Sequence, residues 1–231
     1  MSKALSKPFQ AIWSAFEAQL FPAPSTDRLF NPYRDGNPEL DRPEAPIIRR
    51  RNLWRYLAAY ETPPPVLLLA EAPGPWGCRF SGVPLTSESQ LLDPDFPLEG
   101  EASGRSKRPH REYSARIYWR VMRPYFPHFF TWSAVPLHPH RPGAPLSIRT
   151  PTQRELRAWM PLVAAIVEVL QPEQVIAVGR KAEFVLQSLG IACTYVRHPS
   201  QGGARQFEAG VRALLGSLSS PDRGTFTRAD L

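Results

Sequence analysis

The stretch Pro63–Gly77, with the sequence PPPVLLLAEAPGPWG, decides the fold class of this chain. Its centre, Val66–Ala70, is a short apolar run bounded by three prolines on one side and by Pro73 and Gly74 on the other. Apolar runs of this length between residues that interrupt regular structure are typical of parallel strands buried on both faces. The stretch therefore predicts a buried parallel strand, and the loop after it carries a carboxylate, Glu71.

Strands and helices alternate along the rest of the chain. Three more short apolar runs predict strands over residues 129–132, 175–178 and 194–196. Apolar residues at helical spacing, with a capping box at Thr152 and Glu155, predict helices between them. These helices cover residues 8–21, 47–60, 113–122, 152–170 and 181–189, and a last one carries Phe207, Val211 and Leu214. Alternation of this kind indicates an α/β fold with a four-stranded parallel sheet.

The 231 residues are enough for one sizeable domain with appendages. We expect residues 1–62 to form an N-terminal helical extension that packs on an α/β domain at residues 63–217. The polar residues 218–231 are expected to form a flexible tail. Residues 86–112 show no hydrophobic periodicity, and a loop of that length is typical of a functional or mobile segment.

The amino-acid composition indicates in which compartment the protein works and what kind of partner it binds. The chain holds 28 Lys and Arg against 21 Asp and Glu, and this net charge of +7 favours a polyanionic partner. Its two cysteines, Cys78 and Cys193, are too few for a disulfide framework or for a four-cysteine metal site on one chain. No apolar stretch reaches the roughly 18 residues of a membrane span, and polar residues interrupt residues 1–21, where a signal peptide would lie. We therefore expect a cytoplasmic protein with no membrane association.

Positive charge gathers in the middle of the chain. Between Ser103 and Tyr125, seven Lys or Arg residues stand against one Glu. Such a run is either a solvated face or a surface that binds a polyanion. Aromatic residues beside the run favour a nucleic-acid polymer over a small phosphorylated ligand, and they are Tyr118, Trp119 and Tyr125.

Candidate chemistry follows three of the predicted strands. Glu71 follows the first strand, Ser133 follows the second, and His198 follows the fourth. Because ligands bind beyond the carboxyl ends of parallel strands, we expect these residues to meet at one edge of the sheet. His138 and His140 suggest a metal, but no third ligand accompanies them, so we expect no metal site.

Four motifs in the same order resemble the uracil-DNA glycosylase superfamily over about residues 67–215. Leu69–Gly74, with the sequence LAEAPG, is similar to the first motif of the bacterial and archaeal family 4 enzymes. The continuation into PGPWG, and then Ser81–Pro84, resembles the single-strand-selective enzymes. His198-Pro199-Ser200 resembles the second motif, and Val175–Ala182 resembles the signature around the third strand.

The resemblance implies a three-layer α/β/α fold and hydrolysis of the N-glycosidic bond of uracil, or of another deaminated base, flipped out of DNA. His198 takes the role of the neutral donor to the leaving base, and Glu71 positions or activates water or stabilises the cationic sugar. The base pocket is expected to consist of Ala72, Phe80, Leu85 and Ser133, with Phe80 stacking on the base. Contacts to DNA are expected from Gly74, Pro75, Arg105, Lys107, Arg108, Lys181, Ser200, Gln201, Gly202, Gly203 and Arg205. We expect the protein to act as a monomer.

Two departures from the superfamily bear on this interpretation. Family 4 relatives hold an iron–sulfur cluster with four cysteines, which this chain lacks, so no cofactor is expected. The superfamily also places an Asn at the end of the second strand, where this chain has Ser133. A serine hydroxyl lacks the fixed donor and acceptor of an amide, so the excised base is left open. Glu71 and His198 favour an active monofunctional glycosylase, whereas Ser133 favours a catalytically weak or inactive DNA-binding member of the same fold.

Overall fold

A computed structural model describes residues 3–216, and its centre is a four-stranded parallel sheet. The strand order is β3-β2-β5-β6. The strands are β2 (Val66–Ala70), β3 (Phe129–Ser133), β5 (Gln174–Val178) and β6 (Thr194–Val196). The predicted α/β class and the four predicted strands are confirmed, while residues 218–231, for which we predicted a flexible tail, lie outside the described residues.

The register of the sheet brings the carboxyl ends of its strands to one edge. Leu69 of β2 lies opposite Trp132 of β3 on one side and opposite Ala177 of β5 on the other. Ala70, the last residue of β2, pairs with Ser133, the last residue of β3. The loops that follow the strands therefore leave the sheet side by side.

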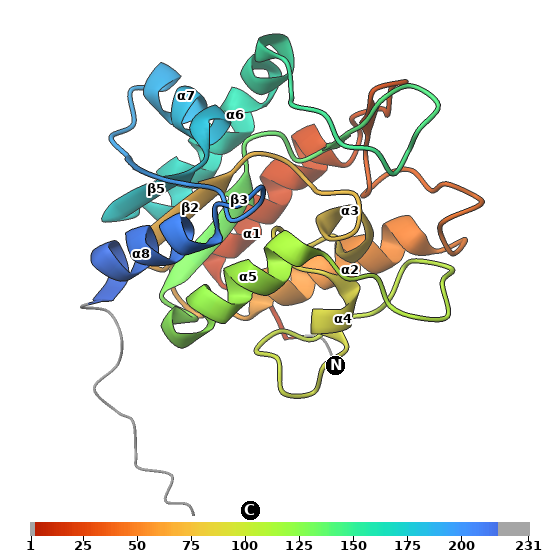
Figure 1. The fold of residues 1–231 in the computed structure, drawn as a ribbon, viewed down its shortest axis with the longest axis horizontal. Coiled ribbons are helices and arrows are strands. Elements are labelled where there is room, and N and C mark those ends of the chain that lie inside the picture. The colour runs from red at the N-terminus through yellow and green to blue at the C-terminus, as the bar shows by residue number, and fades with distance from the viewer. Residues whose placement is uncertain (1–2, 217–231) are drawn as a thin grey trace, which may run out of the picture.

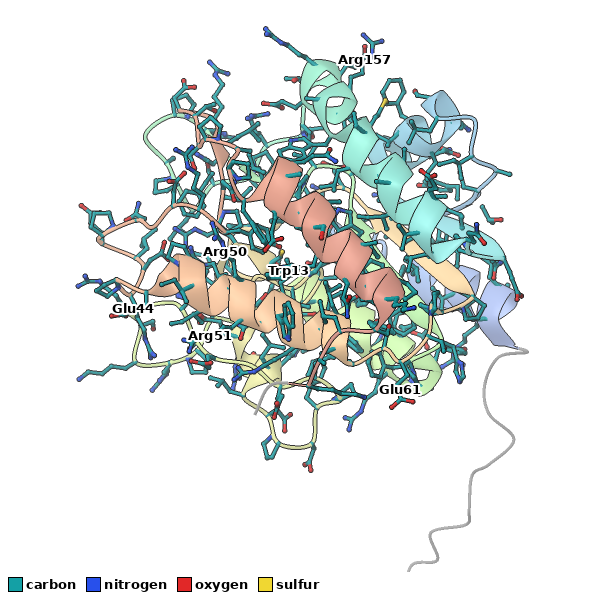
Figure 2. The ribbon with its side chains drawn as sticks, turned by 180° about the vertical axis from the view of Figure 1, so that it is seen from behind. Trp13, Glu44, Arg50, Arg51, Glu61 and Arg157 are labelled. Atoms are coloured by element: carbon teal, nitrogen blue, oxygen red, sulfur yellow. The ribbon has the colours of Figure 1, made fainter. Side chains whose placement is uncertain are left out.

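Helices cover both faces of the sheet. The main ones are α1 (Lys7–Ala15), α2 (Ala45–Ala58), α5 (Tyr113–Met122), α6 (Gln153–Leu170), α7 (Arg180–Ser188) and α8 (Ala204–Leu215). Figure 1 shows α5 and α8 over one face, and Figure 2, seen from behind, shows α1 and α6 over the other. Each helix buries an apolar stripe, which in α8 consists of Phe207, Val211 and Leu215.

The helices that precede the sheet contribute to the same core as the strands. α1 continues as a π-helical turn, Phe16–Leu20, whose Phe16 ring stacks on Trp132 with 4.5 Å between the ring centroids. The hydroxyl groups of Tyr56 and Tyr60 donate hydrogen bonds of 3.1 and 2.8 Å to backbone carbonyls of the edge strand β3. These hydrogen bonds pair backbone carbonyls of the edge strand β3 that would otherwise be open to pairing with another chain.

The outer side of α1 and α2 carries a shallow apolar groove, whose position is marked in Figure 2 by Trp13 and Arg50. The side chain of Ile47 lines the groove and is 61 % exposed. Two of the arginines that border it, Arg51 and Arg55, pair with Glu101 at 3.1 and 3.0 Å. The groove shares no lining residue with the cavity at the sheet edge described below.

A buried ionic cluster joins the N-terminal residues to the loop after β2. Asp41 accepts hydrogen bonds of 2.6 and 3.2 Å from Arg79, and its Oδ1 lies 2.5 Å from Nη2 of Arg49. The three side chains are at most 1 % exposed. The Arg79 guanidinium also lies 4.1 Å from the centroid of the Phe80 ring. Because buried charges persist only when they are paired, this cluster holds the loop after β2 to the N-terminal segment.

The segment 86–112 is folded around one buried carboxylate. Glu88, in the one-turn helix α4 (Glu88–Leu91), accepts hydrogen bonds of 2.6, 2.8 and 3.1 Å from the backbone amides of Ser103, Gly104 and His110. The Ser103 hydroxyl in turn donates a hydrogen bond of 2.6 Å to the Phe80 carbonyl. The segment lacks hydrophobic periodicity because a polar centre, rather than an apolar stripe, organises it.

Four short elements complete the fold, and the sequence pattern predicted none of them. They are the helix α3 (Cys78–Ser81), the 3-10 turn η2 (Arg123–Tyr125) and a small antiparallel pair of β1 (Leu29–Phe30) with β4 (His138–Pro139). Among residues 3–216, no helix combines the length and the apolar character that crossing a bilayer requires.

Candidate active site

A cavity of about 390 Å³ opens at the carboxyl edge of the sheet. The loops after β2, β3, β5 and β6 contribute to its walls, as the register of the sheet requires. Nine of the residues predicted from the sequence line it: Glu71, Ala72, Gly74, Leu85, Ser133, Lys181, His198, Ser200 and Gln201. The fold therefore brings the two predicted catalytic residues into one cavity.

The other predicted site residues lie away from the cavity lining. Phe80, the predicted stacking residue, is fully buried, and its ring stacks on His110 with 3.7 Å between centroids. Its role in stacking on a base stays a prediction, because His110 and the Arg79 guanidinium already pack on this ring. Pro75 and Gly203 are at least partly buried, whereas Arg105, Lys107, Arg108, Gly202 and Arg205 are exposed.

Leu85 lines the cavity in an unusual backbone conformation. Its φ angle is 48°, in the left-handed region that side chains other than glycine avoid. Strain of this kind costs about 1–3 kcal/mol and concentrates at functional sites, where the surrounding structure maintains it. Leu85 is one of the apolar residues of the cavity lining, and it is held there in this strained conformation.

Glu71 and Lys181 place opposite charges in the cavity. The backbone carbonyl of Glu71 accepts a 3.0 Å hydrogen bond from the amide of Val135, which fixes the loop after β2 to the loop after β3. Burial raises the pKa of the Glu71 carboxyl, and the ammonium group of Lys181, in the first turn of α7, acts in the opposite direction. A carboxylate in this setting can orient a water molecule or face a cationic sugar.

His198 is held as a neutral imidazole with a defined tautomer. Its Nδ1 accepts a hydrogen bond of 3.2 Å from the backbone amide of Ser200 and lies 2.8 Å from the Ser200 hydroxyl. Because a backbone amide can only donate, Nδ1 is unprotonated and the ring proton is on Nε2. Burial, together with the positive charge of Arg197, lowers the pKa of His198 to about 4. His198 is therefore a neutral Nε2–H donor at physiological pH.

Groups that favour an anion surround His198. Gly179, with a φ of 95°, precedes α7, so the amino-terminal end of that helix meets the cavity. Backbone amides and the helix dipole at such an end attract phosphate. Arg197 and Lys181 add two cationic side chains to the same walls. The arrangement suits the phosphates on either side of a bound nucleotide.

The sequence pattern did not single out Glu112, which also lines the cavity. Burial raises the pKa of its carboxyl to about 7, and the Ser114 hydroxyl donates to its Oε1 at 3.1 Å. Within the sequence, Glu112 stands in a run of basic residues, where a carboxylate is ordinarily a solvated partner.

Ile148 is another cavity residue that the sequence pattern did not single out. Its side chain is 57 % exposed and borders the cavity from the loop after β4. The next residue, Arg149, anchors this loop with hydrogen bonds of 2.6 and 2.8 Å to the Glu155 carboxylate and of 2.9 Å to the Arg28 carbonyl. A rigid loop therefore presents an aliphatic side chain at the mouth of the cavity.

His138 and His140, the two histidines after β3, do not form a metal site within the part of the chain that the structure describes. Both ring nitrogens of His138 lie near backbone carbonyls, those of Pro73 at 2.8 Å and Pro145 at 3.2 Å. Burial is the main cause that lowers the pKa of His138 to about 4. Within residues 3–216, no group of three His, Cys, Asp or Glu side chains is arranged to hold a metal ion.

Comparisons with known proteins agree with this architecture. The crystal structure of wild-type SMUG2 from Pedobacter heparinus superimposes with a TM-score of 0.59 over 91 % of this chain and 97 % of that chain, at 13 % sequence identity. A search of curated protein sequences finds no match. The family model described as the uracil DNA glycosylase superfamily matches residues 58–216. By this match over more than half of its length, the chain belongs to the uracil DNA glycosylase superfamily.

Proposed function

We propose that this protein hydrolyses the N-glycosidic bond of uracil, or of another deaminated base, that has flipped out of DNA. The observation that carries the proposal is the neutral Nε2–H tautomer of His198, in the same cavity as Glu71. A hydrogen-bond donor can stabilise the leaving base, and a carboxylate can stabilise the cationic sugar or orient water. Family membership supports the reaction class and DNA as the substrate.

The reaction divides between the two residues. The bond between the base nitrogen and C1′ breaks, its electron pair stays on the base, and the sugar becomes an oxocarbenium-like cation. His198 donates through Nε2–H to the oxygen on which the negative charge of the base develops. The negative charge of Glu71 favours the cation, and its carboxylate orients the water whose oxygen forms the new bond to C1′. The water proton passes to Glu71 or to solvent.

The alternative is a catalytically weak or inactive member of the superfamily that binds damaged DNA. Ser133 favours it, since this residue lines the cavity with a hydroxyl in place of the amide on which its relatives depend. Under either reading, the exposed cations Arg105, Lys107 and Arg108 contact the phosphate backbone. A monomeric, cytoplasmic protein stays the expectation for both.

A single-turnover assay separates the two functions. Oligonucleotides that carry uracil, hypoxanthine or xanthine, as single strands and as duplexes, are incubated with the wild type, with His198→Ala and with His128→Ala. His128 is an exposed histidine just before β3, away from the cavity lining, so its variant controls for the loss of an imidazole.

We expect the wild type and His128→Ala to release one of these bases at equal rates. Loss of the His198 donor should lower the rate about 10²–10³-fold, as for other preorganised oxyanion donors. Tight DNA binding without release of any base by the wild type would refute the enzymatic function and leave the alternative.

A further inference from the structure

The carboxyl of Glu112 is a buried titratable group that the reaction above does not use. Glu112 immediately precedes α5, a position from which acidic side chains often cap the helix, but its side chain makes no capping hydrogen bond. The Ser114 hydroxyl instead donates to its Oε1 at 3.1 Å. The carboxyl is thus bonded to a side chain of the first turn of α5 and not to the free amides of that turn, and both residues line the cavity.

Two glycines of the loop after β2 form the seat for this carboxyl. A Cβ atom added to Gly74 would lie 1.8 Å from Oε1 of Glu112, and one added to Gly77 would lie 1.8 Å from Oε2. Neither glycine has a positive φ angle, so the close approach of the carboxyl accounts for the absence of a side chain at both positions. The carboxyl therefore fills space that the backbone of the loop leaves open.

The surroundings of this carboxyl favour its neutral form below neutral pH. Burial raises its pKa to about 7, and the hydrogen bond from Ser114 offsets only part of that effect. The titratable group close to it on α3 is the Cys78 thiol, whose own pKa burial raises to about 12. The other charged groups in the cavity wall are Glu71, Lys181, Arg149, Arg180 and Arg197.

A neutral carboxyl has the hydrogen-bonding capacity that Ser133 lacks. It presents an O–H donor and a carbonyl acceptor in one plane, as an amide does, whereas a serine offers one rotating hydroxyl. Deaminated bases carry a ring carbonyl that can accept such a donor. When the carboxyl ionises, it can only accept, and it repels the same carbonyl.

We propose that Glu112 is a specificity-determining residue, whose carboxyl contacts the edge of the flipped base and sets the size and polarity of the base that fits. The inference rests on the proposed function of the cavity. It assigns two effects to one group: the carboxyl excludes bases with an added ring substituent from the space beside Gly74 and Gly77, and it donates to a base carbonyl while it is neutral.

The test compares Glu112→Ala, Glu112→Gln and the wild type on paired oligonucleotides with uracil or a 5-substituted uracil. Glu168→Ala, which removes an exposed carboxylate from α6, is the matched control. The readout is the ratio of single-turnover rates for the two bases, because a purely structural defect would lower both rates together. The same ratio is measured as binding affinity for 2′-fluoro analogues, in which fluorine disfavours the oxocarbenium-like cation, so that the inference is tested even if no base is released.

We expect Glu112→Ala to raise the relative rate or affinity for the 5-substituted base at least tenfold, since one methyl group in a fitted pocket is worth about 10–200-fold. Glu112→Gln should keep the wild-type ratio, because it preserves the volume. Glu112→Gln should also remove the fall in rate that the wild type shows as pH rises through about 7. Glu168→Ala should match the wild type throughout.

Ratios within twofold of the wild type in Glu112→Ala would overturn the inference, as would an unchanged pH profile in Glu112→Gln. If Glu112→Ala does not fold, Glu112→Gln still decides through its pH profile. Failure of the proposed function has a different signature: the wild type then releases no base, while the affinity ratios of the 2′-fluoro analogues remain measurable.

Discussion

Replacement of Asp41 by Asn tests whether the N-terminal segment holds the loop after β2. The carboxylate accepts hydrogen bonds from Arg79 and lies 2.5 Å from a nitrogen of Arg49, and all three side chains are almost completely buried. An amide of the same shape removes the negative charge that pairs with both guanidinium groups, and only the more weakly coupled Glu88 carboxylate still favours the Arg49 cation. The perturbation is therefore electrostatic, with little change in packing.

The magnitude follows from the burial of the cluster. Removal of one partner from a buried ion pair costs about 3–5 kcal/mol. With a urea m-value of about 3 kcal/mol per M for a chain of this size, the unfolding midpoint should fall by about 1–1.7 M. Equilibrium unfolding in urea, followed by tryptophan fluorescence and by circular dichroism, measures this shift.

The matched control is Glu101→Gln, which removes a carboxylate that also pairs with two arginines, Arg51 and Arg55. Its side chain is 38 % exposed, so water screens these pairs and the cost should stay below about 1 kcal/mol. The reasoning would be refuted if the unfolding midpoints of Asp41→Asn and Glu101→Gln differed by less than about 0.3 M urea, which is roughly the precision of the measurement. The buried cluster would then contribute no more than a surface pair.

Three further predictions concern the cavity and its surroundings. His198 should become protonated, and lose the hydrogen bond from Ser200, only as pH drops through about 4; an NMR titration of its imidazole with an inflection near 6.5 would contradict this. Ile148→Ala should slow excision from duplex DNA about tenfold or more relative to single strands, because an apolar side chain at the cavity mouth can fill the gap left by a flipped base. The equally exposed Ile47→Ala, in the groove on the other helices, should leave that ratio unchanged, and equal ratios in both variants would exclude such a role. Neutralising three exposed cations of the 103–112 segment, Arg105, Lys107 and Arg108, should lower the slope of log affinity against log salt by about 0.9 per charge removed, and an unchanged slope would place DNA elsewhere.

The strands could be predicted from sequence because each is specified locally. Val66–Ala70, for example, is an apolar run between prolines and a glycine-containing loop, and this local pattern is enough to predict a buried strand. The helix predicted over residues 8–21 is instead α1 followed by a π-helical turn, since apolar spacing does not reveal a change in backbone hydrogen bonding. The segment 86–112 could not be predicted, because Glu88 binds amides that lie 15–22 residues further along the chain.

The site residues that were predicted depend on local sequence, whereas the missed ones depend on contacts between distant parts of the chain. Glu71 and His198 could be found because they follow strands, and parallel strands converge at one edge. Glu112 reaches the cavity only through the path of the 86–112 segment, so no local pattern indicates it. One signal could have suggested it: two glycines three residues apart, Gly74 and Gly77, where close approach of another group explains the missing side chains.

The three backbone amides that donate to Glu88 divide the segment 86–112 into fixed anchor points and an exposed turn between them. They fix residues 103, 104 and 110, while Lys107 and Arg108 lie on the exposed turn between these anchor points. We expect substitutions in that turn to leave the Glu88 carboxylate and its three amide donors in place, because the turn contributes none of these groups. On the proposal that these two cations contact DNA, substitutions in the turn would change affinity for the DNA backbone separately from the reaction in the cavity.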